Sequence, residues 1–106
     1  MVSNSGSLLV HVPQVSGLRT RERVRIVGRA VVRVAELLGA DIEVFQKRHL
    51  LSVWVYYRNG ESELSPVYID WGKDWGEHEV FNSMRSELSR FALHHTNPVL
   101  QSPQVS

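Results

Sequence analysis

Residues 20–39 read TRERVRIVGRAVVRVAELLG, and this stretch decides the fold. Large apolar residues recur in it at spacings of three and four, at Val24, Val27, Val31, Val34 and Leu38. This spacing places them on one face of a helix, so the stretch predicts an amphipathic helix that packs against a core. Thr20 is the expected N-cap, and Gly39 is the expected left-handed residue after the last turn. Valine lowers helix propensity, so we expect tertiary packing to stabilise this helix.

Three stretches that follow this helix have the composition of β-strands. They are Asp41 to Lys47, Leu50 to Arg58 and Glu61 to Asp70. Asn59-Gly60 predicts a tight type I′ turn, so the second and third stretches should pair antiparallel. Pro66 lies inside the third stretch and predicts an edge strand or a β-bulge there.

A second helix is expected after the loop that repeats Asp-Trp-Gly. Asp74 and Glu77 have the spacing of a capping box, and Asn97-Pro98 is the expected end of the helix. Its apolar stripe consists of Phe81, Met84, Leu88 and Phe91. Near the start of the chain, Leu8 to Val12 is short and β-branched, and it can be either a strand or an extended arm.

The chain has 106 residues, which is the size of one domain. We expect an α+β domain over residues 8–95, with disordered polar tails at 1–7 and 96–106. The element order is an optional strand, a helix, three strands and a helix, written (β)-α-β-β-β-α. The expected sheet has three to four mainly antiparallel strands, with both helices on one of its faces.

The order of a helix, three antiparallel strands and a helix is similar to the layout of double-stranded RNA-binding domains. The resemblance is one of topology, and it implies duplex RNA as the ligand. Binding in that family relies on a basic start to the second helix. The matching stretch here, Asp74 to Glu79, is acidic, so no binding residue of the family is carried over.

The two faces of the predicted sheet differ in composition if tight turns lie at Arg48-His49 and Asn59-Gly60. One face is apolar enough to form the core and collects Ile42, Val44, Leu51, Val53, Val55, Tyr57 and Leu64. The other face collects Glu43, Phe45, Lys47, Leu50, Trp54 and Tyr56. Its three aromatic residues predict a platform that docks a partner or stacks nucleic-acid bases. The alternative is that the N-terminal segment, the Trp71 to Gly76 loop or a second copy of the chain covers this face.

The net charge of +1 hides a strong separation of charge along the chain. Between positions 19 and 33, six arginines stand against Glu22, a sum of +5, whereas between 61 and 79 six acidic residues stand against Lys73, a sum of −5. The arginines are Arg19, Arg21, Arg23, Arg25, Arg29 and Arg33. Three interpretations are open: contact with a nucleic acid or another polyanion, contact with an acidic protein partner, or pairing with the acidic segment of the same or a neighbouring chain.

Several kinds of chemistry find no support in the sequence. The chain has no cysteine, which excludes disulfides and thiolate metal sites, and the adjacent His94-His95 cannot chelate one ion as an i, i+4 pair would. No phosphate-binding glycine loop, nucleophile elbow, membrane-spanning run or secretory signal is recognisable. We therefore expect a cytoplasmic protein without enzymatic activity, metal or cofactor, and without a membrane partner.

The leading hypothesis is a small interaction or regulatory protein that docks a protein partner and can form a homodimer. The residues expected to carry the contact are Arg21, Arg25, Arg29, Arg33, Phe45, Trp54 and Tyr56. The alternative is a nucleic-acid-binding module that uses the same arginines for phosphate contacts.

Overall fold

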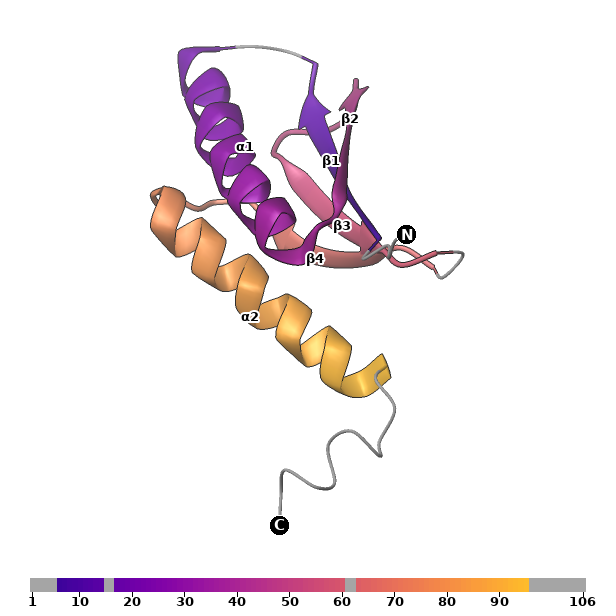
Figure 1. Ribbon diagram of the computed structural model, residues 1–106. Coiled ribbons are helices and arrows are strands. Elements are labelled where there is room, and N and C mark those ends of the chain that lie inside the picture. Colours follow the sequence, from indigo (N-terminus) through magenta and orange to yellow (C-terminus); the bar gives the residue numbers. More distant parts are fainter. Residues whose placement is uncertain (1–5, 15–16, 61–62, 96–106) are drawn as a thin grey trace.

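The computed structural model describes residues 6–14, 17–60 and 63–95, with residues 91–95 described by their backbone alone. Its elements are β1 (Ser7–Pro13), α1 (Leu18–Leu38), β2 (Asp41–Lys47), β3 (Trp54–Arg58), β4 (Ser65–Ile69) and α2 (Glu77–His95) (Figure 1). The predicted α+β class and the predicted order of elements are confirmed, and the optional first strand is present. Residues 1–5 of the predicted tail 1–7 and the whole predicted tail 96–106 lie outside the described residues. β1 begins at Ser7, so the predicted N-terminal tail extends one residue too far into the fold.

The sheet is mixed, and its strand order is β2-β1-β3-β4. β1 runs parallel to β2 and antiparallel to β3, and β4 is antiparallel to β3. The predicted turn at Arg48-His49, which would pair the second and third strands directly, is therefore wrong, because β1 lies between them. A helical crossover such as α1 is what places two parallel strands side by side. The resemblance to double-stranded RNA-binding domains is thus limited to the order of the elements.

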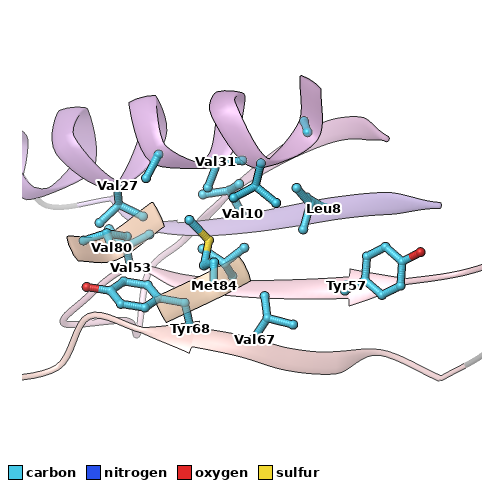
Figure 2. Close-up of a cluster of buried hydrophobic side chains, with 14 of the residues drawn as sticks. Leu8, Val10, Val27, Val31, Val53, Tyr57, Val67, Tyr68, Val80 and Met84 are labelled. Atoms are coloured by element: carbon cyan, nitrogen blue, oxygen red, sulfur yellow. The ribbon is translucent and has the colours of Figure 1, made fainter. Parts of the chain in front are cut away.

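Both helices pack on the same face of the sheet, as predicted (Figure 1). The core between them joins residues of α1, of α2 and of all strands except β2, namely Leu8, Val10, Val12, Val27, Ala30, Val31, Val34, Ala35, Val53, Val55, Tyr57, Val67, Tyr68, Val80, Met84 and Leu88. Figure 2 shows Val27 and Val31 of α1 above the strand residues, with Met84 of α2 among them. α1 therefore buries its valine face, and this burial offsets its low intrinsic propensity.

The predicted core face of the sheet is correct for the central residues and wrong for two leucines that lie outside the strands. Val53, Val55 and Tyr57 are buried as expected. Leu51 is 77% exposed and Leu64 is also exposed, so their assignment to the core is wrong. Both residues lie in the connections before β3 and before β4, where the alternation of a strand does not apply.

The termini of the helices differ from the prediction at their N-terminal ends. α1 starts at Leu18 with Gly17 as N-cap, so Thr20 is not the cap, whereas Gly39 adopts the predicted left-handed conformation with φ of 70°. α2 starts at Glu77, and the Gly76 backbone N–H donates to Glu79 Oε1 at 2.9 Å. This is the side-chain-to-backbone contact of a capping box, but it joins Glu79 to Gly76 rather than Glu77 to Asp74 as predicted.

The antiparallel pairing of β3 with β4 is confirmed, but the connection is longer than a two-residue turn. A type I′ turn requires a positive φ at both of its central residues. Gly60 has a φ of 66°, but among the described residues only glycines have a positive φ, so Asn59 and Gly60 do not form the predicted turn. Pro66 lies in the edge strand β4, where a register shift interrupts the ladder between Val55 and Tyr56. This confirms the predicted edge position and irregularity.

Candidate docking surface

Three of the six α1 arginines pair with the acidic segment of their own chain. Arg19 Nη2 lies 2.8 Å from Asp74 Oδ1, and Arg33 Nη1 lies 3.4 Å from Glu77 Oε2. Arg33 also stacks on the Phe81 ring at 4.1 Å from its centroid. Its guanidinium therefore joins α1 to α2, and Arg33 is not a free contact residue of the kind expected.

Arg23 is the third of these arginines, and it forms a buried ion pair with Asp70. Its Nε and Nη2 donate to the two carboxylate oxygens at 2.8 and 2.7 Å, and its Nη1 donates to the Trp75 carbonyl at 2.7 Å. The Tyr68 hydroxyl donates to Asp70 as well. The hydrogen bond with Asp70 raises the pKa of Arg23, and burial opposes this effect without reversing it. Sequence analysis missed this cluster, although Arg23 lies four residues before the buried Val27 and thus on the apolar face of α1.

Burial also raises the pKa of Tyr68, and the hydrogen bond to Asp70 adds to the shift. Above pH 10, the ordinary tyrosine value, an unfolded Tyr68 ionises while the folded one keeps its proton, so ionisation favours unfolding. We therefore expect the free energy of unfolding to fall as the pH rises above about 10, and to fall less steeply in Tyr68→Phe. Urea unfolding midpoints from pH about 8 to 11 measure both slopes. Parallel slopes would refute the role of Tyr68, and burial of Tyr57 contributes the alkaline sensitivity that remains.

The outer face of the sheet, away from the helices, carries a cluster of four rings: His11 of β1, Phe45 of β2, and Trp54 and Tyr56 of β3. His11 pairs across the ladders with Phe45 on one side and Trp54 on the other. Its ring centroid lies 5.3 Å from that of Phe45 and 4.8 Å from that of Tyr56, and the Trp54 and Tyr56 centroids are 6.2 Å apart. We call these residues the ring cluster. Leu9 lies on the same face and is only 4% exposed.

The predicted aromatic platform is thus brought together, with His11 as an additional member. The alternation of β1 is the signal that could have found it, because His11 is out of phase with Leu8, Val10 and Val12. Burial lowers the pKa of His11, and the nearby Lys47 lowers it further, so the ring is neutral at pH 7.

The charges around the ring cluster are of both signs. The Lys47 ammonium lies 5.8 Å from the Phe45 ring centroid. Arg58 Nη2 lies 3.7 Å from Glu43 Oε2, and both of these side chains are partly exposed. Asp41 and Glu43 lie on this face of β2 and offset Lys47 and Arg58, so the positive charge that favours an acidic ligand comes from the exposed arginines of α1.

Arg21, Arg25 and Arg29 are exposed and form no ion pair with any residue that the structure describes. Arg25 and Arg29 line a groove between α1 and β2 on the core side of the sheet, together with Val44. Phe45, the next residue, belongs to the ring cluster on the opposite side. The structure therefore separates the predicted arginine and aromatic residues into two surfaces that meet only at the β2 edge.

No group of three or more histidine or acidic side chains within residues 6–14, 17–60 and 63–95 could hold a metal ion. Over the same described residues, neither helix is long and apolar enough to cross a membrane. Comparison of the chain with protein families, with curated proteins and with solved structures found no match.

Proposed function

We propose that this chain is a small interaction protein that docks an acidic segment of a protein partner on its outer sheet face. The observation that carries the proposal is the ring cluster of His11, Phe45, Trp54 and Tyr56, which no helix of the described chain covers. Aromatic side chains supply large contact area at low entropic cost, and they dominate the energetics of protein interfaces.

The chemistry of the partner follows from the charges of the surface. Lys47 lies at the margin of the ring cluster, Arg25 and Arg29 add positive charge beside β2, and Arg21 is exposed on the same helix. Positive charge outside the apolar centre of an interface mainly increases the association rate of an acidic partner. We therefore assign anchoring to the rings and steering to the arginines.

Nucleic-acid binding is the second candidate, and the arrangement of Trp54 and Tyr56 favours it. Their rings are nearly parallel, with an interplanar angle of 20°, which suits stacking against bases. The position of the arginines favours a protein instead. A nucleic-acid strand whose bases stack on the rings would have its phosphates near Lys47. Arg25 and Arg29 lie on the other side of the sheet, away from those phosphates.

A photo-crosslinking amino acid at Tyr56 tests the proposal in cells of the source organism. Tyr56 is partly exposed within the ring cluster, whereas the control position Leu51 is more exposed and lies beside Pro13 and Trp71. We expect a discrete protein adduct from position 56 and not from position 51. With that partner purified, Trp54→Ala should weaken the Kd at least about tenfold, and Leu51→Ala should leave it unchanged.

The same variants separate the two candidates. An unchanged Kd in Trp54→Ala, or no adduct specific to position 56, would contradict the proposal. A labelled oligonucleotide at low salt should not bind the wild-type chain. Binding that falls steeply with salt and is weakened by Trp54→Ala and Arg29→Glu would replace the protein partner by a nucleic acid.

A further inference from the structure

The free edge of β2 is the starting point of a second inference, which goes beyond the proposed function. Among the strands that the structure describes, β2 pairs only with β1. The Asp41 N–H donates to the Gly6 carbonyl, and the Lys47 carbonyl accepts from the Gln14 N–H, so the odd-numbered residues face β1. Backbone groups alternate along a strand, so those of Ile42, Val44 and Gln46 point toward the open edge.

Apolar side chains are exposed along this edge. Val44 is 63% exposed and Ile42 is 37% exposed, although both point to the side of the sheet that α1 covers. They line a groove of about 380 Å³ between α1 and β2. The surface of this groove is almost entirely apolar, and Arg25 and Arg29 are the charged residues that line it. α1 lies over the neighbouring strand β1 and leaves this part of β2 uncovered, so the groove has room for a further apolar layer.

Edge strands are commonly protected from pairing by proline, by a bulge or by a charge in the middle of the strand. The other edge, β4, has such protection in Pro66 and in the register shift beside it. β2 has neither, and it pairs with β1 in unbroken register over its whole length. Its centre, Val44 and Phe45, is uncharged. β2 is therefore the edge that is suited to accept another strand.

The charges of β2 select the occupant. The strand begins with Asp41 and Glu43 and ends with Lys47, followed by Arg48. A second β2 in the antiparallel direction places the acidic end of each strand against the basic end of the other. A parallel copy would place like charges together. We propose that two copies of this chain pair through their β2 edges, antiparallel, to form one continuous sheet.

The free backbone groups and the charges suit a register with Val44 opposite Val44 of the second copy. Ile42 then lies opposite Gln46, and each opposed pair exchanges backbone hydrogen bonds across the open edge. Asp41 lies opposite Lys47 on the outer face. A register shifted toward the start of the strand would place Glu43 opposite Glu43 of the second copy, and the two like charges would repel each other. In the favoured register the two ring clusters lie on the same side of the joined sheet.

Sedimentation equilibrium at micromolar concentrations tests the proposal, with a dimer expected at twice the monomer mass of 12.1 kDa. Val44→Lys places a charge at the centre of the paired edge and should shift the chain to the monomer. The matched control Leu51→Lys places the same charge on an exposed leucine away from β2 and should remain dimeric. A monomeric wild type, or a Val44→Lys variant that still dimerises like the control, would overturn the proposal.

A charge exchange tests the register itself. Asp41→Lys and Lys47→Glu each create like charges across the edge, so each should weaken dimerisation. The double variant Asp41→Lys/Lys47→Glu restores opposite charges and should dimerise better than either single variant. Absence of this recovery would exclude the antiparallel register. Val44→Lys changes neither a ring of the cluster nor Lys47, so a loss of dimerisation in this variant is distinguishable from failure of partner docking.

Discussion

Replacing Asp70 with alanine is expected to lower the free energy of unfolding by about 3–5 kcal/mol. The carboxylate is 2% exposed and its partner Arg23 is 11% exposed, so the ion pair lies almost entirely out of water. Without Asp70, the guanidinium loses both of its hydrogen bonds to the carboxylate. The Tyr68 hydroxyl loses its acceptor in the same change. The cost is large because a buried, uncompensated charge remains, not because the ion pair is intrinsically strong.

Urea unfolding measures this loss, and Asp74→Ala is its matched control. Asp74 also pairs with an α1 arginine, Arg19, and this contact lowers the pKa of Asp74, but both side chains are largely exposed. Screening by water makes such a pair weak, so we expect almost no change in the unfolding midpoint of Asp74→Ala. Equal effects of the two variants would refute the role assigned to the buried pair. Adding Arg23→Met to Asp70→Ala should recover part of the loss, because the unpaired charge is then removed.

Replacing Met84 with alanine is expected to cost about 2–5 kcal/mol of unfolding free energy. Met84 is fully buried, and it projects from α2 into the core below α1 (Figure 2). Its truncation removes apolar contact and leaves a cavity that the neighbouring valines cannot fill, because β-branched side chains have few alternative rotamers. The effect should appear in calorimetry as a lowered Tm of the whole domain, since α2 shares one core with α1 and the sheet.

Leu51→Ala is the control for Met84→Ala, since it removes an apolar side chain that is already in water. We expect its unfolding free energy to stay within about 0.5 kcal/mol of the wild type. A Met84→Ala variant as stable as Leu51→Ala would show that α2 is not part of the cooperative core. A low-temperature transition confined to α2 would show instead that this helix melts on its own.

Much of the fold could be predicted from the sequence, because secondary structure follows local periodicity. The valine face of α1 and the left-handed Gly39 follow from spacing and from the conformational freedom of glycine. The bounds of β2 match the predicted 41–47 for the same reason. The position of β1 between β2 and β3 could not be predicted, because strand neighbours are chosen by burial and by the path of the connections.

The candidate docking surface was also predictable only in part. Alternation placed Trp54 and Tyr56 on one face of their strand, but that Phe45 shares this face is decided by the registers of β2 and β3 with β1, in which His11 lies opposite Phe45 and Trp54. Whether each α1 arginine is paired or exposed could not be predicted. Helical spacing defines the side of the helix on which an arginine lies, but not which residues of other elements pack against that side. Arg33 meets Glu77 and Phe81 only because α2 packs there.

The sequence by itself determined the element types, the alternation within each strand and the separation of charge along the chain. Each of these depends on residues a few positions apart. Only the tertiary structure decided that Arg19, Arg23 and Arg33 pair with the acidic segment, while Arg21, Arg25 and Arg29 stay exposed, the last two beside β2. Pairing of charges more than forty residues apart depends on how the helices and strands pack, and no local pattern encodes that packing.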